Sequence, residues 1–391
     1  MSLGAVLACG VPAMMLAVNL DDHDRSGRCA VEDFSSNLLN SLPHGAILFV
    51  DGDNHTFPIW YAHETLGVRP DVTVVNISYL ALPAYRISLM RPQSGAPGLE
   101  SMATPGRIAY GAYQLVPASY ASGGDTLMLA DALRELFADT VASPRLRRSV
   151  ALLPVGDSTA AVSPAQAIAD GGSRRLQWQQ LAIIDIVGAN AAGRRRPVVF
   201  DSSVRRRFYG WMEAAVRPTL FGRVYLPGGD TAAMCDLDVR SALALRGGGF
   251  SRNAGRDVPY LDPTTATQLR CQRSAMIRQA RRMLAVGDAG GALRVALAVD
   301  SVFPASAIPY MYSPAGDSLY YEGHEYISLL RDLADATGFR QAALKADTLQ
   351  TTLRRRLDAY RTYYNSLPPG RRHALSYETL RMLRHPQPKS K

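Results

Sequence analysis

A segment with helical signals lies between two apolar segments in the stretch from Ala46 to Leu80, AILFVDGDNHTFPIWYAHETLGVRPDVTVVNISYL. Residues 46–50 are continuously apolar, which is typical of a strand buried on both faces. Residues 72–77 are rich in β-branched side chains and favour a second strand. A strand, a helix and a strand within about 30 residues predict a right-handed βαβ unit with two parallel strands.

The segment between the two strands carries helix start and stop signals. Thr56 can cap the helix, Pro58 is tolerated in a first turn, and Gly67 supplies the stop. The loop before the helix then lies at the carboxyl end of the first strand, where open α/β sheets usually bind ligands. The predicted ligand-binding residues are Asp51, Gly52, Asp53, Asn54, His55, Thr56 and Trp60.

Length and composition limit the class of protein. The chain has 391 residues, enough for two or three domains, and its apolar content of 47% is that of a globular protein. The formal charge is +9, and arginine supplies nearly all of the positive charge. The arginine clusters are scattered and lack interleaved aromatics or a nucleic-acid motif, so we predict no nucleic-acid partner. The four cysteines show no C-x-x-C spacing, which argues against a structural zinc site.

The first twenty residues contain no charged side chain. That length can span a hydrocarbon core, and no basic region precedes it as in a signal peptide, so residues 1–20 predict a membrane helix. A buried core helix is the alternative. A charged run comes next, as expected where a chain leaves a bilayer, and it includes Asp22, His23, Asp24 and Arg25. Such runs are usually solvated, and a strand or helix cannot converge all of these side chains on one metal.

Apolar periodicity places further elements along the chain. Helices are expected over residues 31–42, 126–139, 176–192 and 208–216, and strands over 149–155, 197–201 and 221–226. Because a strong helix precedes the strand at 197–201, we expect it to be a third parallel strand. Residues 83–124 read as a long ordered loop with short elements, and the Gly-rich residues 228–263 as a domain boundary.

The last third of the chain predicts helices without strands. Residues 274–285 and 290–300 form one expected helical hairpin, and residues 326–336 and 339–364 a second, in the pattern of tetratricopeptide pairs. The predicted fold is therefore α/β, with a mostly parallel sheet and flanking helices, followed by a helical, tetratricopeptide-like part. The predicted domains are a membrane helix at 1–20, an α/β domain at 21–255 and a helical cap at 264–384.

The Asp51–Gly52–Asp53 triplet after an apolar strand matches the D-x-D arrangement of nucleotide-sugar transferases. There two carboxylates hold a divalent cation that neutralises a diphosphate. In the alternative, Asp53 and Asn54 cap the helix and Gly52 makes a tight turn. Apart from this cation we predict no cofactor. His55 and His63 are about two helical turns apart, too far to bind one ion together.

Several motifs occur in one order over about sixty residues. They are NLDDHDRSGR at residues 19–28, Asp33-Phe34, Asn37-x-Leu39, AILF at 46–49, GDNHTFPIWY at 52–61, GVRPDV at 67–72 and VNIS at 75–78. Together they resemble the C-terminal half of a bacterial family of large membrane proteins, long known as a domain of unknown function. That family is similar to eukaryotic protein O-mannosyltransferases, which have a multi-pass GT-C-type membrane core. The resemblance continues weakly through residues 181–190, 197–200 and 221–227.

Three positions depart from the family pattern. His55 stands where the family usually has Asp, and Asp51 replaces a residue that is commonly Asn. Residues 191–196 together with Asp201 diverge from the family's W-x-R-P-I-Y-F-A pattern. The family's membrane core, with the acidic residues that would act on a lipid-linked sugar, has no counterpart in this chain.

The resemblance implies the last membrane helix and the extracytoplasmic region of a protein O-mannosyltransferase-like glycosyltransferase, as a fragment or a split gene product. It implies an inner-membrane location with the soluble part facing the periplasm, and a multi-pass core or partner subunit that completes the enzyme. The region would then assist binding of an acceptor protein or glycan. Two alternatives remain: a free-standing metal-dependent enzyme using Asp51 and Asp53 on a nucleotide sugar or phosphoester, and a protein-interaction module built on the helical pairs.

Overall fold

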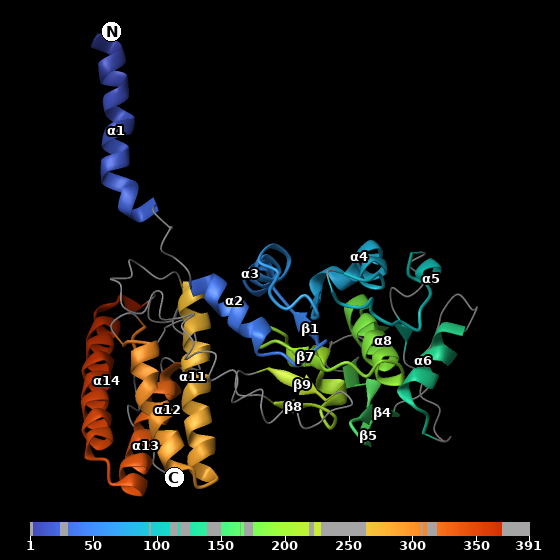
Figure 1. The fold of residues 1–391 in the computed structure, drawn as a ribbon. Helices are drawn as coiled ribbons and strands as arrows, with labels where there is room; N and C mark the ends of the chain where they lie inside the picture. Colours follow the sequence, from blue (N-terminus) through green and yellow to red (C-terminus); the bar gives the residue numbers. More distant parts are fainter. Residues whose placement is uncertain are drawn as a thin grey trace. The chain divides into compact units, whose positions relative to one another are not determined.

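The computed structural model describes residues 3–23, 30–93, 95–109, 116–117, 126–138, 150–164, 166–167, 175–218, 223–227, 263–305, 308–310 and 319–369 (Figure 1). The chain divides into two compact units. One comprises residues 35–244, and the other residues 1–34 together with 245–391. The first unit contains all of the described strands, and the second contains the long helices of the last third of the chain.

A five-stranded sheet in the order β2-β1-β7-β9-β8 forms the centre of the first unit. β1 (Ile47–Val50) pairs in parallel with β2 (Thr73–Asn76) and with β7 (Val198–Phe200), so Ile47 lies opposite both Thr73 and Val198. The βαβ unit and the third parallel strand are thus confirmed. All of the side chains of these three strands are buried, as continuous apolar runs predict.

The other half of the sheet is antiparallel. β9 (Val224–Leu226) runs antiparallel to both β7 and β8 (Arg217–Pro218). Only residues 219–223 separate β8 from β9, too few for the crossover that a parallel pair requires. The sheet is therefore mixed, and the expectation of a mostly parallel sheet was wrong.

The helices of this part of the chain are α2 (Ala30–Asn40), α3 (Asp53–Trp60), α4 (Pro83–Leu89), α5 (Pro105–Ala109), α6 (Leu129–Ala138) and α8 (Trp178–Ala192). Of these, α4, α5, α6 and α8 contribute buried side chains to the core that they share with the sheet. Every residue of α8 from Gln180 to Ala191 is buried, and α8 packs against α6. The rings of Phe49 and Phe200 stack at 4.9 Å between their centroids and join β1 to β7.

Short elements complete the unit. β4 (Ala151–Val155) and β5 (Ser158–Val162) form an antiparallel hairpin, and β3 (Val116–Pro117) pairs with β6 (Arg175–Leu176). η2 (Ser78–Ala81), η3 (Arg206–Phe208) and η4 (Gly210–Met212) are 3₁₀ turns. The helix expected over residues 208–216 is thus reduced to 3₁₀ turns, and the loop expected over 83–124 contains α4 and α5.

The first turn of α3 lies earlier than predicted. The helix begins at Asp53, after Gly52 with φ of 80°, and no side chain caps it. The Thr56 hydroxyl instead donates to the carbonyl of Gly52 at 2.8 Å, which places Thr56 inside the first turn. Pro58 therefore lies within the helix. α3 continues directly into η1 (Tyr61–Thr65), a π-helical turn, and Gly67 with φ of 67° comes after it as the predicted stop.

The second unit contains four long helices: α11 (Pro263–Ala285), α12 (Ala289–Val302), α13 (Leu319–Thr337) and α14 (Arg340–Ser366). α11 packs against α12, and α13 against α14, so both predicted hairpins are confirmed. Gly287 and Gly338 make the turns with positive φ. The tetratricopeptide-like character is not confirmed: α11 and α14, at 23 and 27 residues, are long for helices of a 34-residue repeat.

The N-terminal residues form α1 (Leu3–His23), whose described apolar side chains include Val11, Met14 and Val18, each more than half exposed. The alternative interpretation, in which residues 1–20 form a buried core helix, is therefore not supported. Among the described residues no helix combines the length and hydropathy needed to cross a membrane, so the predicted membrane helix is not confirmed. Asp22 and His23 lie in the last turn of α1, while Asp24 and Arg25 fall outside the described residues.

Candidate functional site

The carboxyl ends of β1, β2 and β7 lie side by side in the sheet and bring three loops together. The backbone N–H of Asp51, after β1, donates to the Ser203 hydroxyl, after β7, at 3.1 Å. The Ser78 hydroxyl, after β2, donates to the Asp51 carboxylate at 3.2 Å. The loop that the sequence singled out is therefore held at the edge of the sheet where it was expected.

His55 and Asp201 form the closest pair of charged groups at this edge. Nδ1 of His55 lies 2.8 Å from Oδ2 of Asp201, and their side chains are 23% and 1% exposed. The same carboxylate accepts a hydrogen bond from the Ser203 backbone N–H at 3.0 Å. Arg223 lies on its other side, with Nε 4.0 Å from Oδ1. The buried carboxylate is thus compensated by two cationic groups.

The pKa values of the pair move apart, as expected for an ion pair. Burial lowers the pKa of His55, but the Asp201 carboxylate outweighs it, and the pKa is raised above its usual 6.5. Burial alone would raise the pKa of Asp201, yet His55, Arg223 and the Ser203 N–H together hold it well below 3.8. His55 therefore carries its positive charge more readily than an exposed imidazole does.

The other predicted loop residues divide into an exposed turn and a buried anchor. Gly52, Asp53 and Asn54 are exposed, whereas Thr56 is buried and accepts a hydrogen bond from the Asn76 amide at 2.9 Å. Gly52 makes the tight turn that the structural alternative predicted, although Asp53 and Asn54 do not cap the helix. Within the described ranges no group of three or more His, Cys, Asp or Glu side chains is placed to hold a metal ion.

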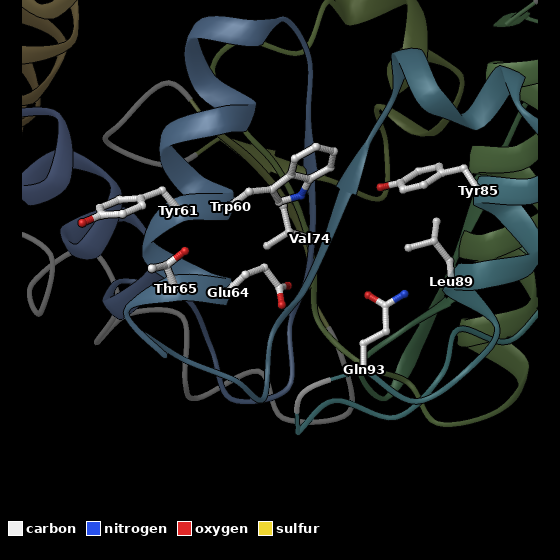
Figure 2. A pocket seen from close by; sticks show the side chains of 8 residues that line it. All are labelled: Trp60, Tyr61, Glu64, Thr65, Val74, Tyr85, Leu89 and Gln93. Atoms are coloured by element: carbon white, nitrogen blue, oxygen red, sulfur yellow. The ribbon is translucent and has the colours of Figure 1, made fainter.

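Trp60, the last predicted residue, lines a pocket of about 350 Å³ beside the edge strand β2. Figure 2 shows the α3–η1 segment on one side, α4 and the residues after it on the other, and Val74 of β2 between them. The lining residues are Trp60, Tyr61, Glu64, Thr65, Val74, Tyr85, Leu89 and Gln93. Aromatic and apolar surface thus surrounds a few polar groups, as in small-molecule sites.

Aromatic side chains form a row that leads into this pocket. The ring of Phe57 meets that of Trp60 edge-on at 6.0 Å, Trp60 lies 5.8 Å from Tyr79, and Tyr79 lies 5.7 Å from Tyr85. Phe57 and Tyr61 are both about half exposed. The Tyr85 hydroxyl accepts the backbone N–H of Asn76 at 2.9 Å, which fixes this ring against the end of β2.

Sequence reasoning found Trp60 but missed the other lining residues. Phe57, Trp60 and Tyr61 are spaced i, i+3 and i+4, so they lie close together on one helix. That cluster is a signal in the sequence. The contribution of α4 could not be found in this way, because residues 83–124 were expected to form a long ordered loop with short elements, and the positions of those elements were not predicted.

A second, much smaller cavity of about 20 Å³ lies between α4 and α8. The buried Asp185 accepts hydrogen bonds there from the Ser101 hydroxyl, at 2.5 Å, and the Met102 N–H, at 2.7 Å. Burial raises the pKa of Asp185 to about 6 despite these hydrogen bonds and the nearby Arg86. The cavity has room for about one water molecule, so we do not regard it as a substrate site.

Comparison with known proteins identifies a related domain over the part of the chain that contains the loop and the pocket. Residues 31–171 match the family model TMEM260-associated domain 2. TMEM260 is described as a protein O-mannosyltransferase-like membrane protein. The match covers about a third of the chain and indicates a membrane-protein-associated domain that is compatible with a glycosyltransferase-related region. It fits a family related to the one that the motifs resemble, without confirming the exact family. No solved structure matches the chain.

The part that matches the TMEM260-associated domain includes β1, α3, β2 and α4, and with them all of the residues that line the larger pocket. Asp201 and Arg223, the partners of His55, lie outside it.

Proposed function

We propose that the α/β unit is an accessory domain that binds a glycan or a glycosylated acceptor for an O-mannosyltransferase-like membrane enzyme. The observation that supports this proposal most directly is the pocket beside β2, whose wall includes Trp60, Tyr61 and Tyr85. A pyranose ring has apolar C–H faces and a polar rim of hydroxyl groups. Aromatic rings offer it rigid apolar area, and the side chains of Glu64 and Gln93 offer hydrogen-bonding groups.

The family comparison supports the same proposal. The matched residues 31–171 contain the whole lining of the pocket, and TMEM260 is an O-mannosyltransferase-like protein. A domain of this kind would work beside a separate multi-pass core at the inner membrane and face the periplasm. The catalytic step would belong to that core, and this unit would hold the acceptor or the growing glycan.

Binding of the purified full chain to an array of mannose-, glucose- and galactose-containing oligosaccharides tests the proposal. We expect at least one class to bind, and Trp60→Ala to weaken that binding about tenfold or more, because the largest aromatic face of the pocket is lost. The matched control is Tyr363→Ala, which removes an aromatic side chain that is 63% exposed on α14. Thermal melting of each variant checks that the fold is intact.

Two results would contradict the proposed glycan binding. One is the absence of glycan binding by the folded wild-type chain, and the other is glycan binding that Trp60→Ala leaves unchanged. Sugar transfer from a donor by this chain alone would contradict the accessory role. Recovery of a multi-pass membrane protein with the tagged chain from detergent-solubilised membranes would support the role assigned to a separate core.

A further inference from the structure

We propose that the pocket beside β2 selects neutral sugars over acidic ones, with the Glu64 carboxylate accepting hydrogen bonds from adjacent sugar hydroxyls. The proposal rests on the glycan-binding function above and names the class of ligand.

The charge of the residues that line the pocket is the reason for the selection of neutral over acidic sugars. Among the eight described residues that line the pocket, Glu64 is the single one with a formal charge, and no arginine or lysine is among them. A uronate, a sialate or a sugar phosphate would bring a second negative charge close to this carboxylate. Like charges repel even where, as here, the carboxylate side chain is 52% exposed, so such ligands are disfavoured. A neutral sugar brings hydroxyl donors instead.

The geometry of His63 fixes the Glu64 carboxyl group. Nε2 of His63 lies 2.9 Å from the carbonyl oxygen of Val72, and a carbonyl can only accept, so Nε2 carries a proton. Nδ1 lies 2.7 Å from Oε1 of Glu64. This contact holds Oε1 against a buried ring.

The π-helical turn directs this carboxyl group into the pocket. Tyr61, Glu64 and Thr65 all belong to η1, where the Leu66 N–H bonds to the Tyr61 carbonyl five residues back at 3.2 Å. Figure 2 shows the Glu64 carboxyl group pointing across the pocket toward Gln93, with Tyr85 above Leu89 on the same far wall. A sugar lying on an aromatic ring of this pocket would meet Glu64 and Gln93 at its rim.

A matched pair of ligands tests the selection. Methyl glycosides of mannose, glucose and galactose, and the uronates of glucose and galactose, are titrated into the full chain and followed by protein-observed NMR or tryptophan fluorescence. We expect the wild type to bind a neutral glycoside about tenfold or more tightly than the corresponding uronate. Glu64→Gln should weaken neutral-glycoside binding about tenfold and bring the uronate to a similar affinity, because a charged hydrogen-bond acceptor and a repulsive charge disappear together.

Two variants separate this inference from the proposed function. Glu135→Gln, at an exposed position of α6, makes the same chemical change outside the pocket and should leave both affinities unchanged. If Trp60→Ala abolishes binding while Glu64→Gln changes neither affinity, the selection inference fails and glycan binding stands. Equal or tighter binding of the uronate by the wild type also overturns the inference. If Trp60→Ala has no effect, the proposed function itself fails.

Discussion

Nδ1 of His55 and Oδ2 of Asp201 lie 2.8 Å apart, and both residues differ from the pattern of the family that the sequence motifs resemble. One comes after β1 and the other after β7, so the pair joins the first turn of α3 to the neighbouring parallel strand. Because the two unusual residues contact each other, the aspartate offsets the charge that a protonated histidine brings to this edge. The loop keeps a defined position in the sheet despite the change.

This pair should make stability depend on pH. The pKa of His55 is higher in the folded chain than its usual 6.5, so its contribution is complete below that value and is lost as the pH rises through the folded pKa. The pKa of Asp201 is held below 3.8, so its contribution is lost as the pH falls below that value. His55→Asn should therefore lower the free energy of unfolding most between about pH 4 and 6.5, by about 2 kcal/mol.

Urea unfolding from pH 4 to 9 measures this dependence. His44→Asn is the control, because the His44 side chain is 93% exposed and 3.9 Å from its partner Asp71. A loss in His55→Asn that stays constant up to pH 9 would show that the pair does not act through charge.

Arg196 should stabilise the amino-terminal edge of the sheet. Its guanidinium donates to the carbonyl oxygen of Gly45 at 2.6 Å and to the Thr73 hydroxyl at 2.7 Å, and its burial lowers its pKa to about 10. Lysine cannot reproduce this planar set of donors. We expect Arg196→Lys to lower the free energy of unfolding by about 2–3 kcal/mol. The exposed neighbour variant Arg195→Lys should change it by less than about 0.5 kcal/mol. Equal losses of unfolding free energy in the two variants, measured by chemical denaturation, would show that Arg196 does not stabilise this edge.

Gly98 should not tolerate a side chain. A Cβ atom there would lie 2.1 Å from the carbonyl oxygen of Met90 and 2.7 Å from its carbonyl carbon, and these are backbone atoms that cannot rotate away. Gly98→Ala should therefore cost about 1–3 kcal/mol and lower the melting temperature. Gly106→Ala, in α5 with no atom within 4 Å of its Cβ position, should be neutral or stabilising. Matching melting temperatures for the two variants would refute the clash.

The Tyr85 hydroxyl should protect the end of β2. It accepts the Asn76 N–H, and burial raises the pKa of this phenol to about 12, so it stays neutral under ordinary conditions. Tyr85→Phe leaves the ring but removes the acceptor, at a cost of about 1–2 kcal/mol. Hydrogen exchange of the Asn76 amide should accelerate in this variant and not in Tyr363→Phe. Unchanged exchange would mean that another group satisfies this amide.

The parallel half of the sheet could be predicted because its strands are short, apolar and rich in β-branched residues between clear stop signals. The start of α3 could not, since Thr56 is a good capping residue and Gly52 leaves no side-chain signature at a cap. The β4–β5 hairpin had a local signal in Gly156-Asp157 between two runs that can form strands. The antiparallel half depended on two very short strands, for which periodicity carries little information.

The position of the loop after β1 could be predicted from the sequence, but the contacts of its residues could not. Strand order at the sheet edge is a consequence of the βαβ pattern, so the loop after β1 was located correctly. The contact of His55 with Asp201 joins residues far apart in the chain, and nothing in a single sequence reports such a pairing. The sequence analysis considered His63 only as a metal ligand together with His55, and the structure shows that it is buried. The sequence contains no local signal for a π-helical turn that would have indicated this.

The π-helical turn η1 makes one wall of the pocket depend on the number of residues in this short segment. Between Trp60 and Leu66 the backbone accommodates one residue more per turn than a regular helix does. Deletion of a single residue in this segment would restore the regular helix, and because the wide turn absorbs the extra residue, the side chains beyond it would keep their directions. In an alignment of relatives, a one-residue gap at this point would therefore mark proteins in which this wall of the pocket is a regular helix and presents one side chain fewer.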